Sequence, residues 1–385
     1  MRIALCLEYP LGLRGGVSVI VENLAAQLAA RGHKIVLVSP DTPDTLSGKR
    51  ELIEQHIYWN YPRPSLGNSR KLAQQLAASQ IDLAHFHAGG NYGWGNRFPF
   101  RSPAYYVSRA GIPVYWTSHR AETILDGYCG PQKPFPFKLL MFPAAWLGKI
   151  QQTSCTRHEI AVSLDNWGKM RRWYWPCRSR FVQLYHSRLH QMPAASETVE
   201  RPPVILSVGH FAEVKGQAIL VEAFGRIATN YPQFTLQLAG HTGADGTCER
   251  VQKLIQEFQL EKRVVLLGER TDTDLLMRRA AIYVQPSMKE ALGLALQEAM
   301  FAGCACIGSR TGGIPELIQQ GQNGLLFKPG DIGELSRALE ELIANPAHRE
   351  QLGRAAVTSI RDRGMTVESM TTSHLKLYQD ARGKG

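Results

Sequence analysis

The chain alternates short apolar segments with segments of helical periodicity, and this alternation constrains its fold more than any other feature. A strand is predicted at Arg2–Leu7, a glycine pair follows at Gly15-Gly16, and from Val17 apolar residues recur at helical spacing. Gly32 ends this helix, and the next apolar strand is Lys34–Val38. Strands that alternate with helices are typical of parallel sheets covered on both faces. The expected fold class is therefore α/β, with doubly wound, Rossmann-like domains.

A polar, proline-rich stretch interrupts the alternation once, after which it restarts. A chain of 385 residues is long enough for two or three domains. We expect a first domain at 1–190, a linker at 191–203, a second domain at 204–365 and a C-terminal helix at 366–385. Two such domains leave a cleft outside the carboxyl ends of their strands, and such clefts bind ligands. The further strands expected are Leu83–Phe86, Val114–Thr117, Val204–Val208, Thr235–Ala239, Val264–Leu267, Ile282–Gln285 and Ala305–Gly308.

Charge and tryptophan are distributed unevenly along the chain. Residues 1–200 hold 23 Lys and Arg against 13 Asp and Glu, whereas the remaining residues hold 21 against 20. All seven tryptophans also lie before residue 200. The basic first half therefore suits an acidic acceptor, an anionic membrane surface or nucleic acid. We favour the first two and expect no nucleic acid, because no nucleic-acid-binding motif accompanies the charge.

Two segments, Pro131–Lys149 and Trp167–Trp175, interleave basic with aromatic and aliphatic residues. Such segments either lie on anionic membranes or form core-facing helices with solvated lysines, and the sequence leaves both interpretations open. No apolar run reaches the roughly 18 residues of a membrane span, and no signal peptide is evident. We expect a cytoplasmic protein that can lie peripherally on the inner face of a membrane. The irregularly spaced cysteines predict reduced thiols.

The sharpest chemical motif is Lys289–Met300, which follows a predicted strand and opens a predicted helix. Glu290 and Glu298 bracket the N-terminus of that helix. A helix N-terminus presents unpaired N–H groups and a partial positive charge, so it suits a diphosphate. Two carboxylates beside it can accept hydrogen bonds from sugar hydroxyls, and Gly293 allows close backbone approach. Taken alone, the motif fits a capping carboxylate and a surface glutamate equally well.

Glycine-rich segments at matching places after other strands support the ligand-binding interpretation. One of them contains His210 and Lys215 and follows the first strand of the second domain, where cations can meet a diphosphate. The segments that carry the pattern are Gly15-Gly16, Arg31–His33, Gly209–Gly216, Gly312–Glu316 and Gly321–Leu325.

Together these segments resemble the retaining nucleotide-sugar glycosyltransferases of the GT-B fold, specifically glycosyltransferase family 4. The resemblance is specific from Pro203 to Leu352 and good over the first forty residues. Between Pro43 and Arg201 it is weak, apart from Asp82–His87 and Pro113–His119. It implies two Rossmann-like domains that face each other across a cleft, with the C-terminal helix packing back on the first domain. The donor would bind the second domain and the acceptor the first.

The resemblance also implies roles for single residues. Glu290 would hold hydroxyls of the donor sugar, Lys215 would neutralise the leaving diphosphate, and His119 would reach toward the donor sugar; these are the catalytic candidates. Glu298 would bind the ribose hydroxyls. The other donor-binding candidates are Gly15, Gly16, His210, Leu292, Gly293 and Leu294. No metal and no cofactor are expected, because the nearest Asp-x-Asp motif, Asp272-Thr273-Asp274, lies in a polar loop before a helix.

Two positions depart from the family pattern. His210 stands where the family usually has an arginine, which puts full neutralisation of the diphosphate in doubt at alkaline pH. His186-Ser187 replaces a common Asn-Gly pair at the domain junction. His85 and His87 have strand spacing, and we expect a packed or acceptor-facing role for them because no third metal ligand lies nearby in the sequence.

The function expected from the resemblance is transfer of a sugar from a nucleoside diphosphate sugar, a UDP-sugar rather than a GDP-sugar, with retention of configuration. The acceptor would be a hydroxyl of a glycan or lipid-linked molecule, in cell-surface polysaccharide biosynthesis. Two alternatives remain open. A sugar-nucleotide 2-epimerase shares the GT-B architecture, although the Glu290/Glu298 pattern argues against it. The second alternative is a non-catalytic subunit that binds a nucleotide sugar. It stays open because His210 replaces an arginine that is usual in the family.

Overall fold

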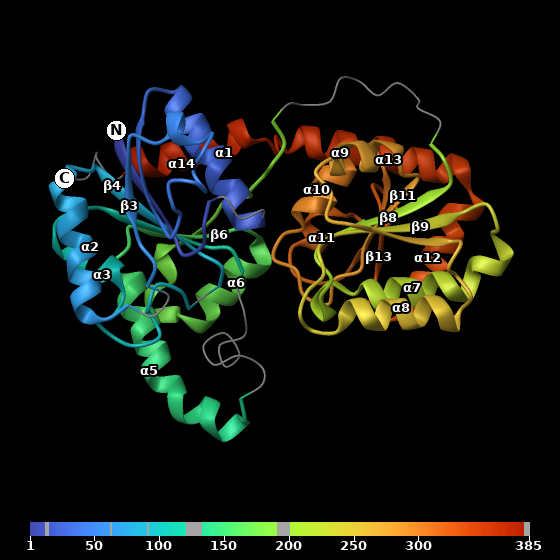
Figure 1. The fold of residues 1–385 in the computed structure, drawn as a ribbon, viewed down its shortest axis with the longest axis horizontal. Coiled ribbons are helices and arrows are strands. Elements are labelled where there is room, and N and C mark those ends of the chain that lie inside the picture. The colour runs from blue at the N-terminus through green and yellow to red at the C-terminus, as the bar shows by residue number, and fades with distance from the viewer. Residues whose placement is uncertain (12–14, 62–63, 91, 121–132, 191–200, 381–385) are drawn as a thin grey trace. The chain divides into compact units, whose positions relative to one another are not determined.

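The computed structural model describes the chain apart from residues 12–14, 62–63, 91, 121–132, 191–200 and 381–385 (Figure 1). Contacts divide it into two compact units. Unit 1 comprises Met1–Arg188 together with Thr366–Gly385, and unit 2 comprises Leu189–Met365. Each unit is built on its own parallel sheet.

Unit 1 has a seven-stranded parallel sheet with the order β3-β2-β1-β4-β5-β6-β7. From β1 the chain adds β2 and β3 on one side, and then β4 to β7 on the other. The switch point therefore lies between β1 and β4, where doubly wound sheets bind ligands outside the carboxyl ends of the strands. The strands are β1 (Arg2–Leu7), β2 (Lys34–Ser39), β3 (Gln55–Tyr58), β4 (Leu83–Ala88), β5 (Val114–Ser118), β6 (His158–Ala161) and β7 (Phe181–Gln183).

The helices of unit 1 bury apolar side chains against this sheet. In α1, Ile20, Val21, Leu24 and Leu28 are buried, at the helical spacing that the sequence predicts. The helices are α1 (Gly16–Ala30), α2 (Leu66–Ala78), α3 (Pro103–Arg109), α5 (Phe135–Ser154), α6 (Leu164–Trp173) and α14 (Val367–Asp380), with 3₁₀ segments η1 (Arg50–Leu52) and η2 (Trp175–Arg180).

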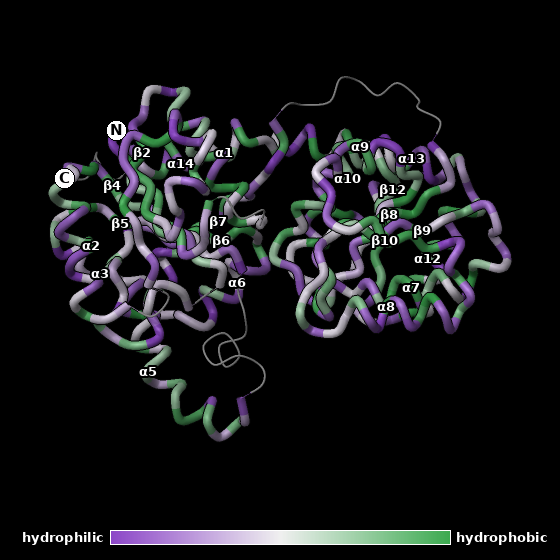
Figure 2. Tube along the Cα trace, viewed as in Figure 1, coloured by the Kyte–Doolittle hydropathy of each residue, from purple (hydrophilic) through white to green (hydrophobic). Residues whose placement is uncertain are grey.

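Unit 2 has a six-stranded parallel sheet with the order β10-β9-β8-β11-β12-β13. Its switch point lies between β8 and β11, which pair through Ile205 and Ile282. In Figure 2 the strands of this sheet are largely green, as expected of strands buried on both faces. They are β8 (Val204–Val208), β9 (Thr235–Ala239), β10 (Val264–Gly268), β11 (Ile282–Gln285), β12 (Ala305–Ser309) and β13 (Leu325–Phe327).

The helices of unit 2 enclose one apolar core with this sheet, and Phe224, Leu335 and Leu339 are completely buried in it. The helices are α7 (Gln217–Ile227), α8 (Thr247–Glu257), α9 (Thr273–Arg279), α10 (Leu294–Phe301), α11 (Ile314–Leu317), α12 (Ile332–Ala344) and α13 (Pro346–Asp362), with 3₁₀ segments η3 (Glu213–Lys215) and η4 (Ala228–Asn230).

The predicted fold class is confirmed: both units are Rossmann-like α/β structures, as in the GT-B fold. The predicted strands of unit 2 agree with the observed ones to within one residue. The sequence analysis did not identify β3, β6, β7 and β13, and β7 has only three residues. β3 alternates polar and apolar residues at a sheet edge, β6 carries a buried glutamate, and β13 has only three residues, so none is a plain apolar run.

Helix α14 packs on unit 1, as the resemblance implies, although all of unit 2 precedes it in the sequence. The Tyr115 hydroxyl donates a hydrogen bond to the Leu377 carbonyl at 2.9 Å, and the Tyr378 hydroxyl lies 2.6 Å from Nδ1 of His85. Arg31 of α1 donates to the Thr372 hydroxyl at 3.1 Å. These contacts attach the helix to β4, β5 and α1.

The segment Pro131–Lys149 forms most of α5, apart from its first residues, which lie outside the described chain. Lys149 is completely buried and forms an ion pair with Glu159 of β6, and Lys138 is also buried. Leu140, in contrast, is 76% exposed. One face of α5 does pack on the core, through Ala145 and Trp146. Lys138 and Lys149, however, are not solvated, and Lys149 is buried because a carboxylate inside β6 requires a buried counter-charge. No helix in the described parts of the chain is long and apolar enough to cross a membrane.

Candidate active site

The carboxyl ends of β8 and β11 bring the two central charged candidates of unit 2 together. Lys215 ends η3 in the loop after β8, and Glu290 lies in the loop after β11. Because β8 and β11 are neighbours at the switch point, these loops lie over the same edge of the sheet. The Lys215 ammonium donates a hydrogen bond to Oε2 of Glu290 at 2.8 Å.

Glu290 is the most fully hydrogen-bonded residue of this site. Its Oε2 also accepts from Nε2 of Gln285 at 3.2 Å and from the Ser287 hydroxyl at 3.1 Å, while its Oε1 accepts from the Ala291 amide at 3.2 Å. Burial opposes ionisation, but the Lys215 charge and these hydrogen bonds outweigh it, so the pKa of Glu290 lies below its usual value. The side chain is a fixed carboxylate that can orient a hydroxyl-bearing ligand.

Two glycines let the loops approach one another. At Gly216 (φ +72°), a Cβ would lie 2.0 Å from the Pro286 carbonyl oxygen, and at Gly312 (φ +54°) it would lie 1.7 Å from that of Glu290. Any other residue would clash with backbone at either position. The amide of Met288 also donates to the carbonyl of Val214 at 2.8 Å, which ties the β8 loop to the β11 loop.

The N-terminus of α10 opens at the same place. Gly293 is its N-cap residue at φ +97°, a conformation that favours glycine, and no side chain among the described residues caps the helix. Leu292 is buried just before it, and Leu294 is the first helical residue. Glu298 lies in the second turn. After burial itself, the charges of Glu298 and then Glu290 raise the pKa of the Tyr283 phenol, so both carboxylates lie near this one hydroxyl.

His210 lies exposed in the loop after β8, with its ring stacked on His241 at 5.4 Å between centroids. Partial burial, then the positive charge of Lys215, lower its pKa below the ordinary value of histidine. His210 is therefore a neutral imidazole at neutral pH in the unliganded protein. All seven candidates of the second domain thus lie in the two loops and the one helix around the switch point of unit 2.

The remaining candidates, Gly15, Gly16 and His119, belong to unit 1. Gly15 is the N-cap of α1, and a Cβ there would meet no described atom within 4 Å. His119 follows β5, and its Nε2 lies 3.2 Å from Nδ1 of His87. Burial, then the charge of His374, lower the pKa of His119 to about 3, so this imidazole is neutral.

Sequence reasoning missed Glu8, which follows β1 at the switch point of unit 1. Its Oε1 accepts a hydrogen bond from the Trp94 amide, and the Trp94 indole donates to the His87 carbonyl at 3.1 Å. A Cβ at Gly93 would lie 2.3 Å from Oε2 of Glu8, so glycine leaves space for the carboxyl group there. Burial raises the pKa of Glu8 to about 7, against weaker opposing effects of the Trp94 hydrogen bond and Arg97. An acidic residue between a strand and a glycine pair was the available signal.

Other polar clusters do not form a metal site. Within the described residues, no group of three or more His, Cys, Asp or Glu side chains could hold a metal ion. In the Asp-x-Asp motif, the two carboxylate oxygens of Asp272 accept hydrogen bonds from Nε and Nη2 of Arg270, at 2.8 and 2.7 Å. His85 is completely buried between Tyr378 and Thr117, so its role is packing.

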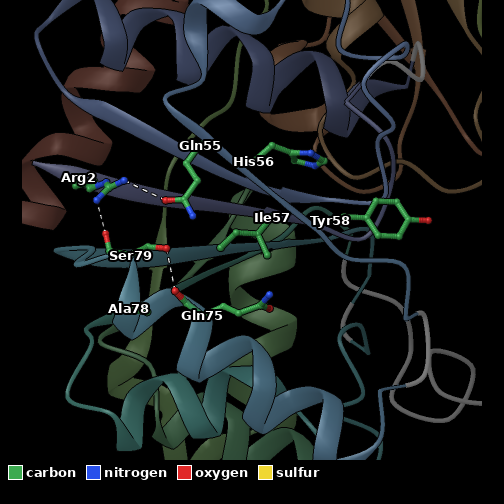
Figure 3. A pocket seen from close by; sticks show the side chains of 8 residues that line it. All are labelled: Arg2, Gln55, His56, Ile57, Tyr58, Gln75, Ala78 and Ser79. Carbon is green, nitrogen blue, oxygen red and sulfur yellow. Dashed lines mark hydrogen bonds between the residues drawn. The ribbon is translucent and has the colours of Figure 1, made fainter.

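A shallow hollow of about 550 Å³ lies elsewhere in unit 1, between β3 and the carboxyl end of α2 (Figure 3). The Arg2 guanidinium beside it is already engaged by the Ser79 carbonyl and the Gln55 side chain, at 2.6 and 3.0 Å. None of the candidate site residues lines this hollow, so it is separate from the candidate site. Its lining residues are Arg2, Gln55, His56, Ile57, Tyr58, Gln75, Ala78 and Ser79.

Two family models match consecutive parts of the chain. The model described as Glycosyltransferase Family 4 matches residues 14–201, and that described as Glycosyl transferases group 1 matches residues 190–358. The chain belongs to glycosyltransferase family 4. The family resemblance drawn from the sequence motifs is thereby confirmed.

Similar proteins extend over the whole chain. The N-acetyl-alpha-D-glucosaminyl L-malate synthase of Bacillus anthracis is 26% identical over 387 residues, which cover 95% of this chain and 94% of that protein. A glycosyltransferase of Rickettsia africae has a similar structure, with a TM-score of 0.77, 18% identity and 98% coverage of both chains. HepE of Anabaena, solved in complex with UDP, gives a TM-score of 0.76 at 18% identity, with 99% of this chain and 100% of HepE covered. This family-4 chain is thus a glycosyltransferase with the GT-B fold.

Proposed function

We propose that this glycosyltransferase takes its sugar from a nucleoside diphosphate sugar bound at the switch point of unit 2. The observation that carries the proposal is the Lys215–Glu290 pair beside the uncapped N-terminus of α10. A diphosphate needs cations and unpaired N–H groups, and a sugar needs fixed hydrogen-bond acceptors. UDP in the complex of the Anabaena relative supports a UDP-sugar in preference to a GDP-sugar.

In this proposal, negative charge grows on the leaving diphosphate as the glycosidic bond to it breaks. The Lys215 ammonium and the amides of Leu292, Gly293 and Leu294 at the start of α10 stabilise that charge. Glu290 positions hydroxyls of the donor sugar, and Glu298 binds the ribose. In unit 1, Gly15 and Gly16 contact the phosphates and His119 contacts the sugar, as the family resemblance implies.

Retention of configuration is part of the proposal. Glu290 is engaged by four hydrogen-bond donors, including the Lys215 ammonium, so it is a poor nucleophile and a good positioning group. We therefore favour attack of the acceptor hydroxyl on the face that the diphosphate leaves, with the diphosphate taking the proton of that hydroxyl. Lys215 and the helix dipole take the place of a divalent cation, so neither a metal nor another cofactor takes part.

The acceptor in this proposal is a hydroxyl of a glycan or of a lipid-linked molecule bound by unit 1, in cell-surface polysaccharide biosynthesis. The excess of Lys and Arg in the first 200 residues suits an acidic acceptor or an anionic membrane surface. A lipid-linked acceptor would require the enzyme to work peripherally at such a surface, on its cytoplasmic side.

A thermal-shift screen with UDP, GDP and their sugars tests the donor proposal. A bound ligand raises the unfolding midpoint, so UDP should stabilise the parent protein. Lys215→Met should weaken UDP binding by roughly tenfold or more, since a charge-assisted hydrogen bond contributes about 1.5–3 kcal/mol. The matched control is Lys253→Met, on the exposed surface of α8. Equal UDP affinity of the parent and Lys215→Met would refute this site.

A turnover assay with the same nucleotide sugars, with and without acceptors, separates the two alternatives from transfer. Consumption of a UDP-sugar without any acceptor, giving an isomerised nucleotide sugar, would identify an epimerase. Tight UDP binding without turnover of any donor, across a panel of glycan and lipid-linked acceptors, would identify a non-catalytic subunit. Donor consumption that depends on the acceptor supports the proposal.

A further inference from the structure

The amino-terminal part of α5 carries a row of exposed apolar side chains. These side chains recur every three or four residues along the sequence, so they share one face of the helix. Leu140 and Leu147 are 76% and 51% exposed, which is unusual for leucine in a folded chain. Figures 1 and 2 show this part of α5 standing away from the sheet of unit 1, with green predominating. We call this face the α5 stripe: Pro136, Leu139, Leu140, Pro143 and Leu147.

The loop before α3 enlarges this apolar surface. The Phe100 amide donates to Oε1 of Gln151 at 2.6 Å, one turn after Leu147, and a Cβ at Gly148 would lie 2.9 Å from the backbone of Phe98. The loop therefore lies directly on α5. Phe98 and Phe100 are themselves exposed, and the Arg101 guanidinium lies over the Phe98 ring at 5.4 Å.

The described charged side chains between Leu83 and Arg157 are all cations. Lys138 and Lys149 of α5 are buried, and Lys149 is paired with Glu159, so neither adds to the surface around the stripe. Lys133 is exposed at the start of α5, with its ammonium 5.9 Å from the centre of the Phe137 ring. Arg101 is exposed in the loop that packs on the helix, whereas Arg97 of the same loop is half-buried and its charge acts on Glu8. An exposed apolar face with cations along its border is the pattern of helices that lie in the interface of an anionic bilayer.

We propose that the α5 stripe, with Phe98 and Phe100, docks unit 1 on the surface of an anionic lipid bilayer. The apolar side chains enter the boundary between headgroups and acyl chains, and Lys133 and Arg101 contact lipid phosphates. Docking would bring unit 1 to a lipid-linked acceptor, and this role rests on the proposed function. The surface itself follows from exposure and charge.

Co-sedimentation of the full chain with vesicles tests the docking. The vesicles are phosphatidylcholine alone and an equimolar mixture of phosphatidylcholine and phosphatidylglycerol. The parent should bind the mixture better, and added salt should weaken that binding because it screens the charges. Leu140→Gln/Leu147→Gln should weaken vesicle binding about tenfold or more, because the burial of one leucine side chain in the bilayer already corresponds to roughly a tenfold change in affinity. Lys133→Gln/Arg101→Gln should reduce the salt dependence.

The matched control is Leu66→Gln/Leu275→Gln, which changes two leucines that are 46% and 48% exposed on α2 and α9. It should bind vesicles as the parent does. Three results would overturn the proposal. The first is equal binding of the parent to both vesicle types, and the second is equal binding by the parent and Leu140→Gln/Leu147→Gln. The third is that the parent is an oligomer in solution, whereas Leu140→Gln/Leu147→Gln, unlike the control, is a monomer. UDP affinity is measured in parallel and should stay constant, so this test and the donor test fail independently.

Discussion

His210 gives the candidate donor site a titratable group where an arginine is usual. Partial burial and then the charge of Lys215 place the pKa of His210 below the ordinary value of histidine. A bound diphosphate favours the imidazolium and raises this pKa. UDP affinity should therefore be highest below the pKa of the free protein and fall as pH rises through the pKa of the complex. Affinities measured between about pH 5 and pH 8 should show this fall in the parent, and His210→Arg should flatten it. Identical profiles would remove His210 from the diphosphate site.

Glu298, in the second turn of α10, should determine donor affinity more than rate. Loss of a carboxylate that holds ribose hydroxyls costs about 1.5–3 kcal/mol, so Glu298→Ala should raise the donor KM by roughly ten- to a hundredfold. Steady-state kinetics with a varied UDP-sugar measure the effect. Glu257→Ala on the exposed surface of α8 is the control. A donor KM unchanged in Glu298→Ala would exclude this role.

Glu8 should affect stability with a definite sign. Its pKa of about 7 in the folded protein exceeds that of an unfolded glutamate, so the folded state holds the proton more tightly. The protonated side chain of Glu8 therefore contributes to the free energy of unfolding in full below about pH 4.5, and this contribution is lost as pH rises to about 7. Glu8→Gln keeps an acceptor for the Trp94 amide, so it should stabilise the protein by up to about 3 kcal/mol above pH 7 and by little near pH 4.5. Urea unfolding at both pH values measures the difference; a pH-independent effect would contradict it.

At the scale of elements, α14 contacts unit 1 through a cluster of buried imidazoles. Ring centroids of His85 and His374 lie 5.6 Å apart, and those of His186 and His374 5.4 Å apart, while His87 touches His119. Burial, above all, lowers the pKa of all five, to about 4 for His374 and about 3 for His119. Burial raises the pKa of the Tyr378 phenol, which contacts His85, so this hydroxyl supplies no negative charge at neutral pH.

Unfolding exposes these histidines, and the unfolded chain binds protons below about pH 6.5 that the folded chain does not. The free energy of unfolding should therefore fall as pH decreases from about 7 to 5, by up to about 1.4 kcal/mol per pH unit for each histidine. Urea unfolding at several pH values measures the slope. His374→Leu should reduce the slope by about one proton, whatever its effect at neutral pH. An unchanged slope would show that His374 is protonated in the folded state.

The elements that the sequence predicted well are those whose apolar runs are short and end at a glycine or a proline. β8, β9 and β11 have the predicted bounds. The environment of α5 could not be predicted, because the burial of Lys149 depends on Glu159, a partner ten residues away in a strand that the hydrophobic pattern does not reveal. Similarly, the Lys215–Glu290 contact joins segments 75 residues apart. Strand order at the switch point, rather than local sequence, brings them together.

At the scale of the whole molecule, the proposed chemistry needs no divalent cation, because Lys215 and the N-terminus of α10 supply the positive charge. Transfer from a UDP-sugar should proceed unchanged after dialysis against EDTA. Rates with and without added manganese, at saturating donor, make the measurement. Activity abolished by EDTA and restored by manganese would overturn metal independence.

Unit 1 is assembled from two stretches of sequence that flank unit 2, and this has a consequence for synthesis on the ribosome. β4 and β5 are made early, yet the helix that covers His85 and Tyr115 emerges only after all of unit 2. Until then, the imidazoles and the Tyr115 ring remain open to water and to other nascent chains. Unit 2, whose residues are contiguous, can complete its core first. We therefore expect the half that is translated first to reach its final structure last.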